Sequence, residues 1–155
     1  LDRARGDKKW GCSAIGASFH DRATAKMAIC SGLLDLAYVR YNPAHAGCET
    51  ELFPYLAPDR SCLTYNFKST MAYVPEPEFR RLDLGAEYPH PTITDGYRFA
   101  LSRPELDGLL VSPQTPEQLA ELLQALDRGP LPASKIKYMQ DLYLLASGQA
   151  TLDSE

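Results

Sequence analysis

The chain has 155 residues, of which 45% are apolar and 23% are charged, with 20 acidic and 16 basic side chains. This length and composition are those of a single globular domain with enough apolar area for a core, and they exclude a disordered chain. The net charge of −4, with the two signs interspersed along the chain, excludes a strongly basic surface, so we expect no nucleic-acid partner.

The sequence also bears on targeting and redox state. No apolar run approaches the roughly 20 residues that a membrane helix needs, and residues 1–5 lack the apolar stretch of a secretory signal, so we expect no membrane partner. Four cysteines lie far apart without a C-x-x-C pair, which favours reduced, mostly buried thiols and a cytoplasmic location: Cys12, Cys30, Cys48 and Cys62. The chain begins with Leu1 rather than Met, so we expect that it was processed or belongs to something longer.

Two strand-and-helix units are predicted in the first third of the chain. An apolar run at 13–17 predicts a strand, and Asp21 then caps a predicted helix over 22–30. A second apolar run at 36–41 predicts another strand, and a short helix is predicted over 49–55, before Pro58 ends it. The chain therefore starts with strands and helices in alternation.

The alternation continues after a long interruption. A third apolar run at 62–67 predicts a strand, and the proline-rich segment from Pro75 to Pro91 predicts a long loop. A helix is predicted from about residue 95 to residue 102, where Pro104 terminates it. The fourth apolar run is 109–111. The interruption thus falls between the third strand and its helix.

The clearest helix start follows the fourth apolar run. Thr115 stands at the N-cap, Pro116 at the first helical position and Gln118 two residues later, which is a capping-box arrangement. Leucines then recur on one face, and we expect this face to pack against the sheet: Leu119, Leu122, Leu123 and Leu126. A last amphipathic helix is predicted over 134–145.

Four strand-and-helix units with apolar strands indicate a parallel sheet covered by helices, and hence an α/β protein. Two architectures fit this pattern: an open doubly wound sheet, or half of a (β/α)8 barrel, which takes roughly 250 residues in full. The pattern alone leaves both open. The sequence contains neither G-x-G-x-x-G nor G-x-x-x-x-G-K-[ST], so the usual phosphate-binding signatures of doubly wound domains are missing.

Five short motifs, taken in order, carry a resemblance to a known family. They are Ala-Ile-Gly-Ala-Ser at 14–18, Tyr-Asn at 41–42, the acidic turn 48–54, the segment 97–104 and the segment 112–119. Together they resemble the fifth to eighth βα units of the aldo-keto reductases, over about residues 9–145. The resemblance implies the C-terminal half of a (β/α)8 TIM barrel, with about four βα units plus a C-terminal helix.

The resemblance also implies a function. Residues 1–155 would be a single domain, the C-terminal half of an aldo-keto-reductase-like barrel whose N-terminal half is not in this chain. The family binds NADP or NAD across the C-terminal mouth of the barrel and reduces a carbonyl compound. Its catalytic Asp, Tyr, Lys and His belong to its first four units, so the resemblance implies no catalytic residue here.

The cofactor contacts that the resemblance implies lie at the ends of the strands. Ser18 matches a serine that holds the nicotinamide carboxamide, and Tyr38 stands where many members carry a glutamine that binds the same group. Tyr65 matches the aromatic residue that stacks on the nicotinamide ring. The family's adenosine-phosphate loop corresponds to Ser112, Gln114, Thr115 and Gln118. The helix N-terminus there can receive a phosphate, but no Lys or Arg accompanies it in the sequence.

Plainer interpretations of the same residues stay open. Tyr65 is either a stacking platform or ordinary barrel filling, and Lys68 is either a rim cation or a solvated side chain. His20 and His45 are interpreted as polar loop residues rather than general acids. His45 and Cys48 are three residues apart, but nothing near them completes a ligand set, so we expect no metal site.

A half-barrel would leave two sheet edges and an inner apolar layer uncovered. At about 25 cal/mol per Å², a few hundred Å² of wet apolar surface costs several kcal/mol, comparable with the stability of a whole domain. We therefore expect a complementary N-terminal half-barrel or another protein chain as partner, and a small carbonyl substrate if the assembly is active.

Two hypotheses about function follow. In the first, the chain is the cofactor-binding half of an NAD(P)H-dependent aldo-keto reductase that reduces an aldehyde or ketone to an alcohol. In the second, it is a non-catalytic structural or assembly subunit of a larger complex. The second is favoured by Phe19, Tyr38 and Leu122, which stand where the family carries amide side chains.

Overall fold

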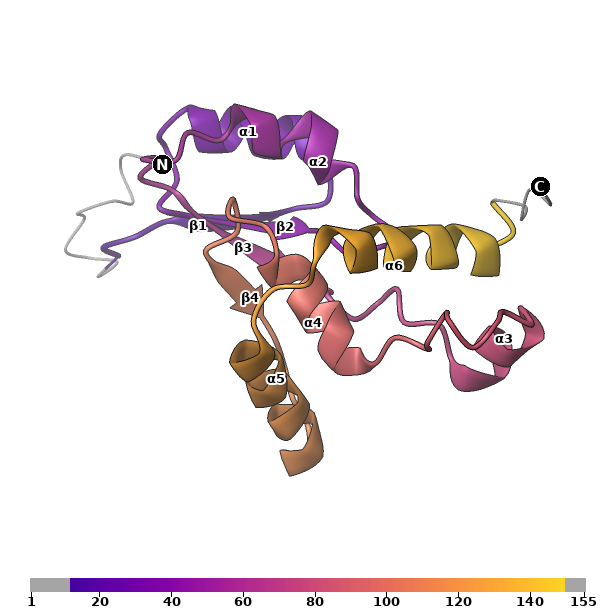
Figure 1. Cartoon of the computed structure of the whole chain (residues 1–155). Helices are drawn as coiled ribbons and strands as arrows, with labels where there is room; N and C mark the ends of the chain where they lie inside the picture. The colour runs from indigo at the N-terminus through magenta and orange to yellow at the C-terminus, as the bar shows by residue number, and fades with distance from the viewer. Residues whose placement is uncertain (1–11, 150–155) are drawn as a thin grey trace.

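The computed structural model describes residues 12–149, in which four strands form one parallel sheet (Figure 1). The strands are β1 (Gly16–Phe19), β2 (Leu36–Arg40), β3 (Leu63–Phe67) and β4 (Gly108–Leu110). Their spatial order, β1-β2-β3-β4, is the order of the chain. A doubly wound sheet reverses its strand order at a switch point, whereas a (β/α) barrel adds each strand beside the last. The strand order therefore decides for the half-barrel.

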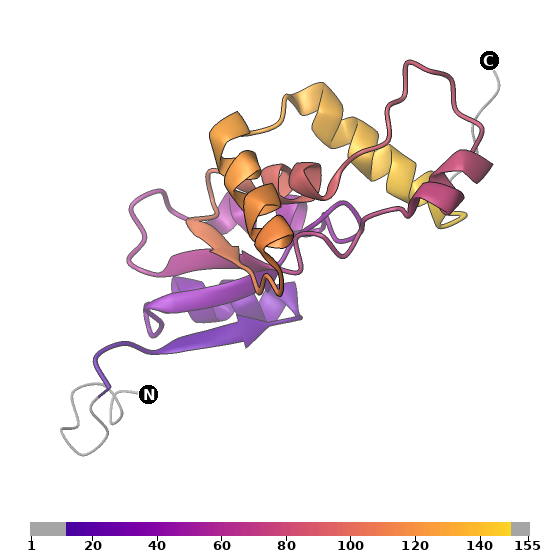
Figure 2. The ribbon, with the colours of Figure 1, turned by 90° about the horizontal axis from the view of Figure 1, so that it is seen from below.

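Helices and one 3-10 turn connect the strands and complete the chain. They are α1 (Arg22–Cys30), α2 (Cys48–Glu51), η1 (Phe53–Tyr55), α3 (Glu76–Arg81), α4 (Ile93–Leu101), α5 (Pro116–Arg128) and α6 (Ala133–Ala146). Figure 2 shows α1 on one side of the strands, and α3 next to the C-terminal end of α6. None of these helices is long and apolar enough to cross a membrane.

The predicted start of α1 agrees with the cap that the structure contains, and the predicted start of α4 does not. Asp21 Oδ1 accepts a hydrogen bond from the Thr24 amide at 2.7 Å and caps α1. Helix α4 begins two residues earlier than predicted, because Thr92 and Asp95 form a reciprocal capping box. β1 starts three residues later and ends two residues later than the predicted run at 13–17. The predicted elements occur in the predicted order, and their ends shift by up to three residues.

The prediction of a loop throughout the proline-rich segment is wrong. Residues 76–81 form helix α3, with Pro77 in its first turn, where a proline costs no backbone hydrogen bond. Glu76 and Glu78 stand in the first turn, and Arg80 and Arg81 in the last. These charges match the helix dipole at both ends.

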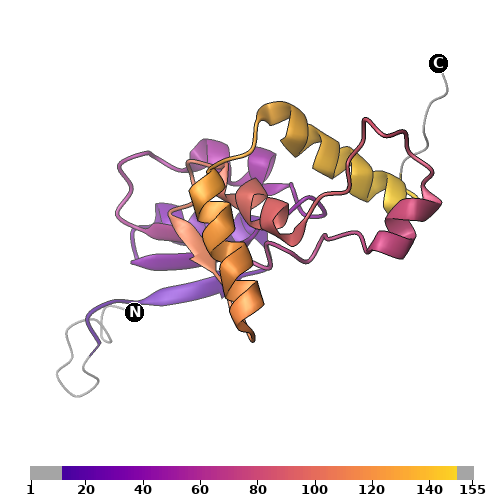
Figure 3. The same cartoon turned by 60° about the horizontal axis from the view of Figure 1, so that its bottom comes forward.

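The prediction that the leucine face of α5 packs against the sheet is also wrong for this chain. Leu119, Leu123 and Leu126 are 45%, 52% and 55% exposed, and only Ala125 of α5 is buried. The physical reason is that α5 packs against α4, beside which it lies in Figure 3, and extends away from the sheet in Figure 1. Leu122, the fourth leucine of the predicted face, is half-buried.

The two faces of the sheet differ sharply. Ala37, Val39, Thr64 and Asn66 point to the helix side and are fully or almost fully buried. There Ala37 and Val39 belong to one core cluster with Ile29 of α1, Phe99 of α4 and Met139 of α6. On the opposite face, Leu63 and Leu110 are 47% and 53% exposed. This open face corresponds to the inside of a barrel, and four strands alone do not cover it.

Candidate functional site

One row of residues crosses the open face of the sheet. The strand register places Ser18 beside Tyr38, Tyr38 beside Tyr65, and Tyr65 beside Gly108. Residues in one cross-strand row point to the same face of a sheet, so Ser18, Tyr38 and Tyr65 share the open face. Ser18 is exposed, and the two tyrosines are half-buried. The structure thus brings together three of the residues implied by the resemblance.

The position of the Tyr65 ring depends on its neighbours in this row. The rings of Tyr38 and Tyr65 are 6.1 Å apart at 57°. On the other side, a Cβ atom at Gly108 would lie 2.7 Å from Cε1 of Tyr65. Only a residue without Cβ allows the ring to lie directly against the β4 backbone, so Gly108 sets the position of the Tyr65 ring.

Two buried asparagines hold the backbone at the carboxyl ends of β2 and β3. Asn66 donates from Nδ2 to the Tyr41 carbonyl at 2.6 Å, and its Oδ1 accepts from the Ser69 hydroxyl at 2.5 Å. Asn42 donates to the Lys68 carbonyl at 2.8 Å. Lys68 itself adopts a positive φ of 60°, and the Asn42 hydrogen bond supports this left-handed backbone.

Asn42 and Asn66 were not predicted as part of this framework. Both are fully buried. A buried amide is stable only when its donors and acceptors are paired. The sequence signals that could have pointed to these two residues were the Tyr-Asn motif at 41–42 and an asparagine within the predicted strand at 62–67.

A groove of about 440 Å³ opens beside this framework, at the carboxyl ends of β3 and β4. Its walls come from the residues after β3, from α4 and from the start of α5: Lys68, Tyr97, Leu110, Ser112, Gln114 and Gln118. The loop before α5 lacks a cation in its own sequence, but the fold brings Lys68 from β3 to the same groove. Burial and the nearby Glu121 raise the pKa of Tyr97.

The loop that leads into α5 is ordered by its own side chains. Thr115 Oγ1 accepts from the Gln118 amide at 3.3 Å, so Thr115 is the N-cap as predicted. Gln118 Oε1 accepts from the Gln114 amide at 2.7 Å rather than from Thr115, so the capping box is shifted by one residue. Gln114 Nε2 in turn lies 3.2 Å from the Ser112 hydroxyl oxygen.

The predicted site residues therefore form two groups. Ser18, Tyr38 and Tyr65 lie on the open sheet face, whereas Ser112, Gln114 and Gln118 line the groove. Thr115 serves as a cap and is not a wall of the groove. Strand β4 links the groups, because Gly108 contacts the Tyr65 ring and Leu110 lines the groove. The row residues lie inside β1, β2 and β3, whereas the groove lies at the carboxyl ends of β3 and β4, where (β/α) barrels carry their active sites.

The histidines and cysteines are engaged in local contacts. His45 Nδ1 lies 3.1 Å from Asn42 Oδ1, and burial lowers the pKa of His45. The Cys48 thiol donates to the Arg40 carbonyl at 3.5 Å, and burial raises its pKa to about 11. His20 meets the Phe67 ring edge-on at 5.4 Å. Within residues 12–149, no group of three or more potential ligands could hold a metal ion.

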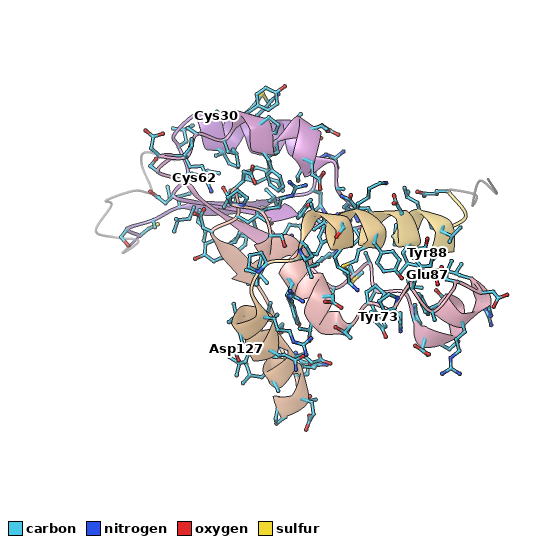
Figure 4. The ribbon with its side chains drawn as sticks, viewed as in Figure 1. Cys30, Cys62, Tyr73, Glu87, Tyr88 and Asp127 are labelled. Carbon is cyan, nitrogen blue, oxygen red and sulfur yellow. The ribbon has the colours of Figure 1, made fainter. Side chains whose placement is uncertain are left out.

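The cysteines are all free, as predicted. Cys48 and Cys62 are buried and Cys12 is half-buried, but Cys30 is exposed on α1, contrary to the expectation of mostly buried thiols; Figure 4 labels Cys30 and Cys62.

Comparison with known proteins identifies this fold. Sequence comparison finds no matching family model and no matching curated protein. An aldo-keto reductase from Bacillus halodurans, in its holo form, superposes with a TM-score of 0.66 at 14% identity, over 91% of this chain and 53% of its own. A thermostable aldo-keto reductase in complex with the inhibitor epalrestat superposes with a TM-score of 0.61 at 21% identity, over 90% and 52%.

The chain has the fold of about half of an aldo-keto reductase. It spans little more than half the length of each of these two reductases. The resemblance in the sequence motifs is thus confirmed at the level of the fold, and so is the half-barrel architecture. Identities of 14% and 21% leave the roles of individual residues to be argued from the geometry of the aldo-keto-reductase-like half-barrel itself.

Proposed function

We propose that this chain is the C-terminal, cofactor-binding half of an NAD(P)H-dependent aldo-keto reductase that reduces an aldehyde or ketone. The observation that carries the proposal is the row of Ser18, Tyr38 and Tyr65 on the open sheet face, next to a groove with polar and apolar walls at the carboxyl ends of β3 and β4. A dinucleotide needs both features, because it has a flat ring at one end and phosphates along its length. The catalytic tetrad belongs, in this proposal, to a complementary half.

The residues of the row fit a nicotinamide. The Tyr65 ring offers a face on the open side of the sheet, and Gly108 holds the ring against the β4 backbone. Ser18, exposed in the same row, offers a hydroxyl to a carboxamide. When bound, the nicotinamide supplies the hydride, and this chain positions the ring and keeps one of its faces covered.

The residues of the groove fit the phosphate end. Lys68 provides a positive charge, and the start of α5 provides the positive end of a 13-residue helix. Ser112 and Gln114 add a hydroxyl and an amide to the same wall. A phosphorylated ribose gains most from the cation, so we propose NADP as the preferred cofactor and NAD as the weaker one.

We propose that a second chain or segment supplies four more parallel strands. β1 and β4 each pair with one neighbour only among the described strands, and Leu63 and Leu110 leave apolar surface on the open face. The leucine face of α5 leaves further apolar surface exposed. A complementary N-terminal half-barrel would cover the two sheet edges, the open sheet face and the leucine face of α5 together.

A second candidate function is a non-catalytic structural or assembly subunit, and one observation favours it. Tyr38 stands in the row where the family carries an amide, and its ring packs against Tyr65. Two adjoining aromatic rings bind a carboxamide less well than an amide side chain does. In this alternative the open face is an assembly surface rather than a cofactor site.

Native mass spectrometry of the chain purified from its source, followed by NADPH titration of the assembly monitored by cofactor fluorescence, tests both functions. The reductase proposal predicts a tetrad-bearing partner and NADPH binding. It further predicts that Tyr65→Leu weakens binding by about fivefold and Lys68→Met by about tenfold. Tyr55→Leu is the matched control, because Tyr55 is an exposed tyrosine outside the row and the groove. An assembly without a tetrad-bearing chain and without NADPH binding would support the structural subunit instead.

We also propose that the protein acts in the cytoplasm. All four cysteines are free, which suits a reducing compartment.

A further inference from the structure

The connection between β3 and α4, residues 68–92, is fastened to itself by one histidine. His90 Nδ1 lies 2.6 Å from Glu76 Oε2, and His90 Nε2 lies 2.7 Å from the Val74 carbonyl oxygen. The His90 ring also stacks on Phe79 at 4.5 Å and 24°. His90, near the α4 end of the connection, is therefore bound to Val74 and Glu76, which lie nearer its β3 end. We call this set of contacts the His90 clasp.

The two hydrogen-bond partners of His90 are both pure acceptors. A carboxylate and a carbonyl have no hydrogen to donate, so each needs an N–H from the ring. A neutral imidazole has only one N–H and satisfies one of the two. The imidazolium has two and satisfies both. The geometry of the clasp is thus complete only when His90 is doubly protonated.

Two charged side chains lie next to the clasp. Glu76 contacts the ring, and Arg80 binds the other oxygen of Glu76 at 2.8 Å. Arg80 and, to a smaller extent, His90 keep the pKa of Glu76 below its usual value, so Glu76 stays ionised. The Tyr73 ring lies beside the His90 ring, with the two ring centres 5.3 Å apart.

Helix α6 packs against the connection at a different point. Tyr138 donates its hydroxyl to the Pro89 carbonyl at 3.0 Å, and its ring lies 5.9 Å from the Tyr88 ring. Lys135 lies over the Tyr138 ring, while Lys137 and Asp141 pair with each other. In the described part of the chain, the ion pair to the His90 ring comes from Glu76 alone.

The clasp holds the wall of two cavities. Lys68 and Met71, in the outgoing part of the connection, line the groove beside α5. Tyr73 and Val74, a few residues later, line a smaller apolar cavity together with Met139 and Leu142 of α6. Figure 4 shows Tyr73 and Tyr88, from the two ends of the connection, in the region between α3 and α6. Release of the clasp would therefore loosen the Tyr73 and Val74 wall of the smaller cavity.

We propose that residues 68–92 form a pH-responsive flap, which the His90 clasp closes when the imidazole is protonated and releases when it is neutral. Histidine is the side chain that ordinarily changes charge between about pH 5 and 8. Loss of the ring proton removes one of the two N–H donors, and the ring then keeps either Glu76 or Val74 but not both. This inference holds whatever ligand the groove takes.

Hydrogen exchange of the full chain, measured by mass spectrometry at about pH 5.5 and about pH 8 and corrected for the intrinsic rate, tests the flap. One hydrogen bond to a charged group is worth roughly a tenfold change in an equilibrium, so protection of peptides within 74–91 should fall about tenfold at the higher pH. Peptides from α1 and β2 should keep their protection. Equal protection of 74–91 at the two pH values would overturn the proposal.

Two variants and a control separate the clasp from general packing. His90→Gln should lower the protection of 74–91 at both pH values. Glu76→Gln should keep protection but lose its pH dependence, because the new amide donates to the unprotonated Nδ1 of a neutral ring. His20→Gln, which changes a histidine outside the connection, should leave the wild-type pH response intact. Wild-type pH dependence in His90→Gln or in Glu76→Gln would contradict the clasp.

Discussion

Arg103 donates from Nε to the hydroxyl oxygen of Tyr41 at 2.7 Å, across 62 positions of the sequence. Tyr41 in turn donates to Glu49 Oε1 at 2.6 Å, and Arg103 also forms an ion pair with Glu49. Gln140 of α6 donates to the same carboxylate oxygen at 2.9 Å. Because Tyr41 is fully buried between Phe53 and Phe99, this network ties α6 and the segment after α4 to the end of β2.

Removal of the cation from this network should destabilise the protein. We expect Arg103→Met to lower the free energy of unfolding by about 2 kcal/mol, because Glu49 and the Tyr41 hydroxyl would lose a charge-assisted partner in a partly buried place. Urea unfolding measures the change. Lys137→Met is the matched control, since Lys137 is 76% exposed in its pair with Asp141, and we expect less than about 0.5 kcal/mol there. Equal losses in the two variants would refute a special role for Arg103.

The same network predicts how the free energy of unfolding depends on pH. Burial raises the pKa of Glu49, but hydrogen bonds from Tyr41 and Arg103 outweigh it and hold the pKa below its usual value. A depressed carboxyl pKa stabilises the folded state above the unfolded-state value and loses this contribution as the pH falls through the folded-state value. We therefore expect the free energy of unfolding to decrease below about pH 4.5. In Glu49→Gln this acid dependence should become shallower, as urea unfolding between about pH 3 and 6 would reveal.

Gly108 and Tyr65 give a prediction about the open sheet face. A Cβ at residue 108 would lie 2.7 Å from Cε1 of Tyr65, so Gly108→Ala should displace the ring and cost about 1–3 kcal/mol of stability. In a Tyr65→Ala background the ring is gone, and the same substitution should cost much less. A double-mutant cycle by urea unfolding measures the coupling. Additive effects would show that the ring does not rest on Gly108.

The exposed leucine face of α5 predicts that the chain alone tolerates a polar substitution there. Leu123→Gln should change the free energy of unfolding of the chain alone by less than about 0.5 kcal/mol, because Leu123 is 52% exposed. Ala125→Leu, two residues later on the buried face, should cost about 1–3 kcal/mol through overpacking. A large loss in Leu123→Gln alone would mean that the leucine face is covered in the isolated chain.

Local signals were sufficient for many of the elements. The Thr115-Pro116 start of α5 was predicted to the residue, because a cap depends on groups a few positions apart. Helix α3 was missed, because the prolines of 75–91 suggested a loop although a proline in a first turn is compatible with a helix. The leucine pattern of α5 predicted a buried face, yet periodicity says only that a face is apolar, and a partner must be present to cover it.

The amino-acid sequence by itself determined the α/β class, the order of strands and helices, and the residue types at the strand ends, since these depend on short-range patterns of hydrophobicity, capping and proline. Only the tertiary structure decided that the strands lie in chain order, that Gly108 makes room for Tyr65, that Lys68 reaches the groove beside α5, and that His90 fastens residues 68–92. The physical reason is that each of these relationships joins groups that are distant along the chain, and their distances are set by the packing of the sheet and helices rather than by any local preference.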